Sequence, residues 1–183
     1  MTECIALLRG INVGRAKRVP MADLRKLLES LGCSRVRTLL NSGNAVFQAP
    51  GGSTRRLASA IEAAIQERFG FPVRVLVHTV RELNAIVGEN SLPQADRDPS
   101  RFLVAFVSSR ADLGKARQLL RESWSPEQIA MGTRAAYLWC ATGILESKLL
   151  QAFGRVVGSS ATTRNWATVL KLRAAASGNK NPA

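Results

Sequence analysis

A basic, glycine-containing stretch near the N-terminus is the part of the sequence best suited to binding chemistry. Residues 9–18 read Arg-Gly-Ile-Asn-Val-Gly-Arg-Ala-Lys-Arg, with four cations and no acidic residue. Gly10 and Gly14 allow positive φ and let a ligand approach the backbone, and Asn12 can both donate and accept hydrogen bonds. The charge comes from Arg9, Arg15, Lys17 and Arg18. A strand-to-helix turn of this kind can offer N–H groups and cations to an anion.

The spacing of this stretch matches neither the P-loop nor the dinucleotide-binding fingerprint. A surface turn whose glycines serve geometry alone explains the pattern equally well. The sequence therefore leaves both interpretations open.

A second candidate site lies near the C-terminus, in Thr162-Thr163-Arg164-Asn165. We expect a helix to begin here, so that the hydroxyls cap it while Arg164 and Asn165 meet an anion. Trp166 is expected in the core. Lys148, at another predicted helix start, could also meet an anion, but adjacent helical residues point about 100° apart, which places it poorly to activate Ser147. The predicted anion-binding residues are Arg9, Gly10, Asn12, Gly14, Lys148, Thr162, Thr163, Arg164 and Asn165.

Residues that usually support metal or nucleophilic catalysis are sparse. The single histidine, His78, ends a predicted strand, where a structural role is the commoner one, and Cys4, Cys33 and Cys140 are widely spaced. This spacing is typical of neither a zinc site nor a disulfide framework. We expect no metal and no cofactor, and no catalytic residue is visible.

The elements that hold the first candidate form a recognisable order. The spacing predicts a strand over 3–9, a helix over 20–31, strands over 36–40 and 45–47, a helix ending at Gly70 and a strand over 73–77. This β-α-β-β-α-β order is the split βαβ, or ferredoxin-like, unit. We expect the basic loop and the turn Asn41–Asn44 to leave opposite ends of their strands. Ser53 is a predicted helix cap, and Thr79 with Glu82 forms a predicted capping box.

The second half repeats the order more loosely after a predicted linker over 90–100. The pattern predicts a strand over 102–107, a helix over 112–122, strands over 129–131 and 136–139, helices over 147–156 and 163–175, and a frayed polar tail over 177–182. We therefore predict an α+β protein of two ferredoxin-like halves packed together. The predicted domains are 1–90, with its following helix, and 91–183, with the C-terminal helices.

The amino-acid composition limits the kinds of partner that the protein can bind. The 183 residues contain 46% hydrophobic and 21% charged residues, which excludes a disordered chain. The net charge of +13 divides evenly, with 13 cations against 7 acids in residues 1–90 and 13 against 6 afterwards. Such charge can steer polyanions, although a proteome-wide arginine bias would produce it too, and 5% aromatic content leaves few platforms for stacking bases.

The sequence also gives expectations for localisation. No apolar run approaches the roughly 18–20 residues that span a bilayer, and the first residues do not resemble a signal peptide. We expect a cytoplasmic protein with no membrane partner.

Several motifs together resemble a known bacterial family. They are Ala6–Gly14, Val19–Arg25, Ser42–Phe47, Tyr137–Trp139, Ser147–Leu149 and Thr162–Trp166. The family is catalogued as domain of unknown function family 1697, and the resemblance covers nearly the whole chain. It implies a cytoplasmic α+β protein of two ferredoxin-like halves and supplies no activity. Two departures are Arg15-Ala16, where a glycine and an asparagine often stand, and Leu39-Leu40-Asn41 before Ser42-Gly43-Asn44.

These observations favour a protein that binds an anionic ligand, either a nucleotide, a phosphate-bearing metabolite or nucleic acid. The alternatives are an enzyme acting on a small phosphorylated or carboxylated substrate, and a protein-interaction module with aromatics such as Phe47 or Trp139 facing outward.

Overall fold

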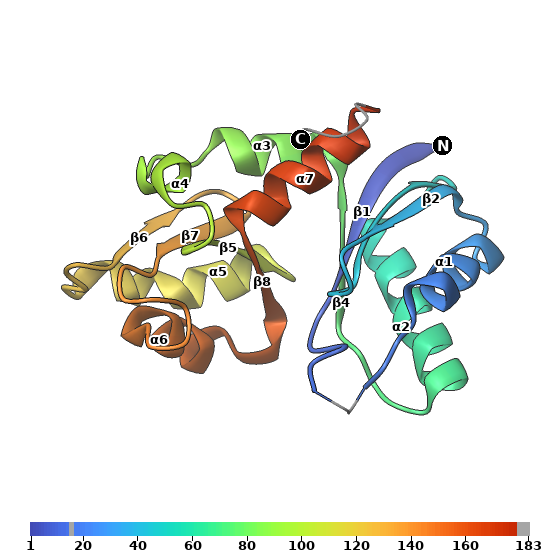
Figure 1. The fold of residues 1–183 in the computed structure, drawn as a ribbon, viewed down its shortest axis with the longest axis horizontal. Coiled ribbons are helices and arrows are strands. Elements are labelled where there is room, and N and C mark those ends of the chain that lie inside the picture. The colour runs from blue at the N-terminus through green and yellow to red at the C-terminus, as the bar shows by residue number, and fades with distance from the viewer. Residues whose placement is uncertain (15–16, 179–183) are drawn as a thin grey trace. The chain divides into compact units, whose positions relative to one another are not determined.

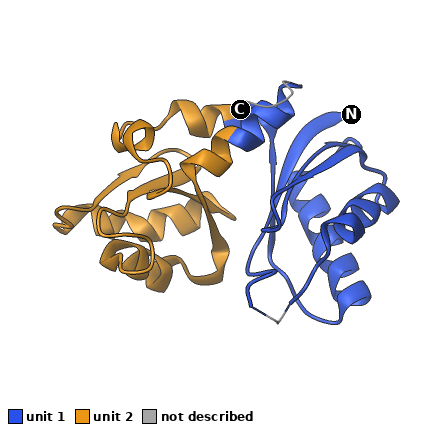
Figure 2. Cartoon of the chain, viewed as in Figure 1, with its two compact units in different colours: residues 1–83, 171–183 blue, residues 84–170 orange. Residues whose placement is uncertain are grey.

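The chain folds into two four-stranded antiparallel sheets with flanking helices (Figure 1). The computed structural model describes residues 1–14 and 17–178. Arg15, Ala16 and the predicted tail from residue 179 onward lie outside these described residues. The chain divides into two compact units: unit 1, residues 1–83 and 171–183, and unit 2, residues 84–170 (Figure 2).

Unit 1 begins with the predicted β-α-β-β-α-β order, followed by a helix that continues into unit 2. Its elements are β1 (Thr2–Leu8), α1 (Met21–Ser30), β2 (Ser34–Leu39), β3 (Asn44–Ala49), α2 (Thr54–Phe69), β4 (Val75–Thr79) and α3 (Val80–Gly88). The strand order is β2-β3-β1-β4, with every neighbouring pair antiparallel. This is the ferredoxin-like arrangement that the sequence predicts.

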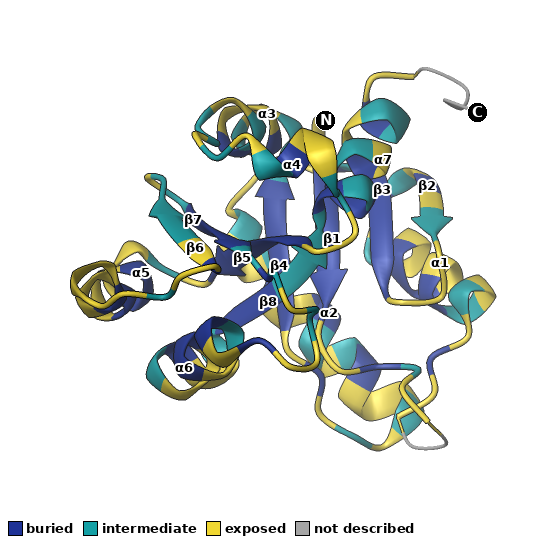
Figure 3. Cartoon of the chain, turned by 60° about the vertical axis from the view of Figure 1, so that its left-hand side comes forward, coloured by how far each residue is buried: buried dark blue, intermediate teal, exposed yellow. Residues whose placement is uncertain are grey.

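Helices α1 and α2 pack on one face of the unit 1 sheet because alternate side chains of the central strand β1 point toward them. Cys4, Ala6 and Leu8 share a core cluster with the buried faces of both helices, which contribute Leu24, Leu27, Leu28, Ala58, Ile61 and Ile65. All six of these helical residues are buried. Figure 3 shows buried segments on both the strands and the helices. The period-2 and helical patterns of the sequence therefore converge on one core.

Unit 2 has the same β-α-β-β-α-β order, including a final strand that the sequence pattern does not predict. Its elements are α4 (Gln94–Arg97), β5 (Phe102–Val107), α5 (Arg110–Ala116), a 3₁₀ turn (Arg117–Arg121), β6 (Gln128–Met131), β7 (Ala135–Trp139), α6 (Lys148–Val157), a short 3₁₀ turn (Gly158–Ser160), β8 (Ala161–Asn165) and the first part of α7 (Trp166–Ala176). The strand order β6-β7-β5-β8 repeats that of unit 1. Leu103, Ala105 and Val107 of β5 face the helices, as their counterparts in β1 do.

One predicted helix start in unit 2 is wrong. Residues 162–165 form strand β8 rather than the first turn of a helix, and Thr163 and Arg164 lie opposite Ala105 and Val104 of β5. The β-branched threonines suit a strand. The helix begins only at Trp166, because the Asn165 Oδ1 accepts the N–H of Thr168 at 2.9 Å and caps it.

The repeats differ most in the connection between their first strand and first helix. In unit 2, only residues 108 and 109 join β5 to α5. In unit 1, residues 9–20 join β1 to α1. Two residues thus suffice for this connection in a ferredoxin-like unit, and the longer one contains the basic stretch.

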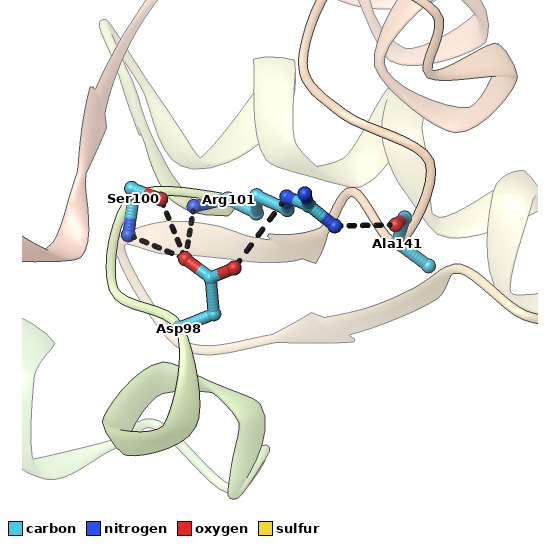
Figure 4. A network of polar contacts seen from close by, with 4 residues as sticks. All are labelled: Asp98, Ser100, Arg101 and Ala141. Atoms are coloured by element: carbon cyan, nitrogen blue, oxygen red, sulfur yellow. Dashed lines mark hydrogen bonds and ion pairs between the residues drawn. The ribbon is translucent and has the colours of Figure 1, made fainter.

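The predicted linker is ordered by a short polar network (Figure 4). Asp98 Oδ1 accepts hydrogen bonds from the Ser100 hydroxyl at 2.5 Å and from the Ser100 and Arg101 N–H groups. Arg101 in turn donates to the Ala141 carbonyl at 3.2 Å. The Ser100 hydroxyl, followed by the backbone donors, holds the pKa of Asp98 below its ordinary value. This network fixes the chain where β5 begins.

Two cap predictions have different outcomes. The Thr79 hydroxyl accepts the Glu82 N–H at 3.1 Å, and Glu82 Oε2 accepts the Thr79 N–H at 2.9 Å, which confirms the capping box. Ser53 stands at the N-cap of α2, but its side chain makes no cap hydrogen bond. No helix of the described residues is long and apolar enough to cross a membrane.

Candidate anion-binding site

The loop after β1 takes its shape from residues with positive φ. Gly10 and Gly14 have φ of 66° and 65°, and Asn12 has φ of 56°. A Cβ built on Gly10 would meet no described atom within 4 Å, so conformation rather than packing requires glycine there. Asparagine is among the few other residues that adopt this region readily. The positions of Gly10, Asn12 and Gly14 in the sequence therefore favour this loop conformation.

The side chain of Asn12 braces the loop from within. Its Oδ1 accepts the Val19 N–H at 2.9 Å, while its Nδ2 donates to the Val19 carbonyl at 2.9 Å and to the Asn41 carbonyl at 2.7 Å. The Asn12 N–H also donates to the Lys17 carbonyl at 3.1 Å. Asn12 therefore organises the loop, and its amide is engaged by the protein itself.

The β2–β3 turn lies beside this loop, so the prediction that the two leave opposite ends of their strands is wrong. Strands β1 and β3 are antiparallel with Leu7 opposite Asn44, which puts the end of β1 next to the start of β3. The Leu8 N–H donates to the Gly43 carbonyl at 2.8 Å. A Cβ on Gly43 would lie 2.7 Å from Leu8 Cβ and 2.8 Å from Ile11 Cδ1, so the turn packs directly on the loop.

The connection between α2 and β4 lies at the same end of the sheet. The Arg9 N–H donates to the Arg74 carbonyl at 2.9 Å, next to the start of β4. We call this surface the loop tip, and define it as residues 9–14, 17–20, 40–43 and 70–74.

The loop tip carries only one sign of charge. Its cations are Arg9, Lys17, Arg18 and Arg74, and none of its residues is acidic. Arg74 lies 3.5 Å from Glu62 in an ion pair. Among the described residues, no ion pair joins Lys17 or Arg18 to a carboxylate, and both are exposed. The predicted contribution of Arg15 falls outside the described residues.

The β8 residues of the second candidate site belong to unit 2. Arg164 is half-buried, and its Nη1 donates to the Thr162 hydroxyl at 2.9 Å and to the Thr163 carbonyl at 2.8 Å. Burial lowers the pKa of Arg164 to about 10, so the guanidinium is charged at neutral pH. Thr162 is buried and Asn165 caps α7. All four residues thus make contacts within unit 2, and their role in anion binding stays a prediction.

The start of α6 is already occupied by a carboxylate that sequence reasoning missed. Glu127 Oε2 accepts the Leu149 N–H at 3.0 Å, and the buried Ser147 hydroxyl accepts the Leu150 N–H at 2.9 Å. Lys148 is exposed beside them. An external anion at Lys148 would have to lie near Glu127, which weakens this position as an anion site. No sequence signal links Glu127 to a helix that begins so far along the chain.

Other predicted residues lie in the core. Trp166 is buried and packs edge-on against Phe102, with ring centroids 5.6 Å apart. Phe47 is buried too, so it cannot serve an outward aromatic surface. His78 is buried on β4, with Nδ1 3.8 Å from Glu82 Oε2. The described residues contain no group of three or more His, Cys, Asp or Glu side chains that could hold a metal ion.

The fold and the loop tip define a class of protein: an α+β chain of two ferredoxin-like repeats with a basic, glycine-containing loop at one end of the first. The chain belongs to the DUF1697 family of proteins of unknown function, which matches residues 1–137. The predicted family is thereby confirmed.

One solved structure with a similar fold is described as the conserved bacterial protein SP0830 from Streptococcus pneumoniae. It is 24% identical, the match covers 97% of this chain and 99% of that chain, and the TM-score is 0.80. At this identity the similarity shows the fold alone. No curated protein matches the chain.

Proposed function

We propose that the protein binds a phosphate-bearing anion at the loop tip of unit 1. The single observation that carries this proposal is the length of the β1–α1 connection. Residues 9–20 connect the first strand to the first helix of unit 1, and residues 108 and 109 make the same connection in unit 2. The fold itself therefore does not require the additional residues in unit 1. Strand-to-helix connections are usually about 2–6 residues long, and loops of about 12 residues or more without secondary structure commonly carry function.

The electrostatics of the loop tip support an anion as the ligand. Lys17 and Arg18 are exposed, and Arg9 and Arg74 lie on the same connections. Arg74 is paired with Glu62, but the cations outnumber this one acidic neighbour, and an excess of like charge raises the local concentration of anions. Because the cations are exposed, binding should weaken as salt screens them over a Debye length of about 10 Å at 0.1 M.

The hydrogen bonds of Asn12 support binding at a defined geometry. Asn12 ties together both ends of the loop and the neighbouring turn through three hydrogen bonds. Preorganisation of this kind reduces the entropy that a ligand must remove on binding. The loop tip has cations and amides but no carboxylate or imidazole for acid–base chemistry, so binding rather than catalysis is the function proposed.

The proposal includes a cytoplasmic location. Cys4, Cys33 and Cys140 are all buried and free. Burial raises the pKa of Cys4 to about 11, which keeps the thiol protonated. Free thiols are typical of reducing compartments.

A paired charge-reversal experiment tests the proposal. Lys17→Glu with Arg18→Glu should weaken binding of inorganic pyrophosphate or a nucleoside triphosphate by about tenfold or more in isothermal titration calorimetry. Arg55→Glu with Arg56→Glu changes the net charge equally on exposed residues of α2 and is the matched control. Equal loss in the two double variants would show a general charge effect and overturn the proposed site.

A further inference from the structure

We infer that the phosphate recognised by the loop tip belongs to an anionic phospholipid surface, into which Val13 and Leu40 insert. This inference rests on the proposed function and names its ligand class. It departs from the sequence-based prediction of no membrane partner, which considered only segments that span a bilayer.

Leu40 is the first observation. It has φ of 57° and is 52% exposed. A bulky residue in the left-handed region is strained, whereas glycine or asparagine would not be. The exposed half of the side chain gains little from packing that would offset this strain. An apolar side chain kept in a strained and exposed position points to a contact outside the unit.

Val13 is the second observation, and it belongs to the same loop tip. It is 75% exposed and directly follows Asn12. Asn12 donates to the carbonyl of Asn41, the residue directly after Leu40. The two exposed apolar side chains therefore belong to residues that directly neighbour the two ends of one hydrogen bond.

The surrounding charge matches anionic headgroups. Lys17 and Arg18 are exposed on the loop that carries Val13, and the loop tip contains no acidic residue. Apolar side chains beside cations are the combination that binds the boundary between anionic headgroups and acyl chains. Each cation near such a surface strengthens binding by about fivefold.

Nucleic acid fits the same surface less well. Bases bind proteins through aromatic stacking, but Phe71 within the loop tip and Phe69 just before it are half-buried against the unit 1 core. The exposed large apolar side chains of the tip, Val13 and Leu40, are aliphatic, and they suit acyl chains.

Vesicle co-sedimentation at two salt concentrations tests the inference with the full chain. Vesicles contain either phosphatidylcholine alone or equal parts phosphatidylcholine and phosphatidylglycerol. The chain should bind the mixed vesicles much more strongly than the neutral ones, to which the apolar side chains alone should give only weak binding. At about 1 M NaCl, where charge is screened to about 3 Å, the residual binding should come from the apolar side chains.

Leu40→Asn is the decisive variant because asparagine accepts the left-handed backbone, so the fold is retained or stabilised. Residual binding at high salt should fall about tenfold in Leu40→Asn and again in Val13→Ser. Leu145→Asn removes a leucine that is 93% exposed in unit 2, and it should bind as the parent does. Identical high-salt binding of Leu40→Asn, Leu145→Asn and the parent would overturn the inference.

The outcomes separate this inference from the proposed function. Binding of pyrophosphate or an oligonucleotide that depends on Lys17 and Arg18, without vesicle binding, would refute the lipid inference and leave the anion site intact. If the Lys17→Glu, Arg18→Glu variant bound every tested anion as tightly as the parent does, both the lipid inference and the proposed anion site would be refuted.

Discussion

Gly43 and Gly10 have similar backbone conformations but different surroundings. Their φ values are 75° and 66°. Gly43 lies against Leu8 and Ile11, whereas a Cβ on Gly10 would meet no described atom within 4 Å. The sequence signals the conformation of both glycines. The contact of Gly43 depends on the antiparallel pairing of β1 with β3, which local sequence does not reveal.

Substitution of the two glycines should separate conformational strain from steric overlap. Gly10→Ala should lower the free energy of unfolding by about 1 kcal/mol, the cost of positive φ alone. Gly43→Ala adds overlap with Leu8 and Ile11, so the loss should reach about 3 kcal/mol. Urea unfolding of both variants measures the difference. Equal losses would mean that the turn and the loop are not packed as described.

The hydrogen bonds of the Asn12 side chain give a second prediction at the scale of single residues. Asn12→Ala removes three hydrogen bonds and should cost about 2 kcal/mol of unfolding free energy. Asn41 contributes to this brace only its backbone carbonyl, so Asn41→Ala should change stability by less than about 0.5 kcal/mol. The two variants are compared by chemical denaturation. A larger cost for Asn41→Ala would show that the bridge does not hold the tip.

At the scale of elements, the sequence predicts strands and helices better than their ends. Thr79 and Glu82 form the predicted capping box because the motif is local. The start of α7 is displaced, because Thr162 and Thr163 suit either a helix cap or a strand. Pairing with β5 decides in favour of a strand. Tertiary pairing of this kind overrides a local preference.

Capping variants test the observed start of α7. Asn165→Ala should cost about 1 kcal/mol, because the Thr168 N–H loses its acceptor. Thr163→Val keeps the β-branched shape that a strand needs and should cost less. Thermal unfolding of the two variants gives the ranking. The reverse ranking would favour a helix that begins at Thr163.

The start of α5 gives a pH prediction. Asp112 accepts a hydrogen bond from the Ser109 hydroxyl at 2.7 Å and lies 3.2 Å from Lys115, and these groups hold its pKa below the ordinary 3.8. A lowered pKa in the folded state contributes stability above pH 3.8, which is lost as pH falls through the folded pKa.

Asp112→Asn should therefore cost stability near pH 6 and progressively less below about pH 4. Urea unfolding across this range measures the trend, and Asp96→Asn, on an exposed carboxylate of α4, is the control. A cost for Asp112→Asn that is constant with pH would contradict the assigned hydrogen bonds.

At the scale of the whole molecule, the chain is a duplication whose repeats agree in detail. Ile5 of β1 lies opposite His78, and Val104 of β5 lies opposite Arg164. In each repeat, the next residue caps the following helix through its side chain. The order of elements in the sequence predicts the duplication, although β8 had been assigned to a helix. The excess length of residues 9–20 stands out only when the two repeats are compared in the structure.

The location of the anion site is the central claim, and an NMR titration tests it most directly. Inorganic pyrophosphate is added to the ¹⁵N-labelled chain, and amide shifts are followed at low and moderate salt. The account predicts saturable shifts concentrated in residues 9–14, 17–20 and 40–43, which weaken as salt rises. Saturable shifts confined to unit 2, around Lys148 or β8, with no change at the loop tip, would contradict it.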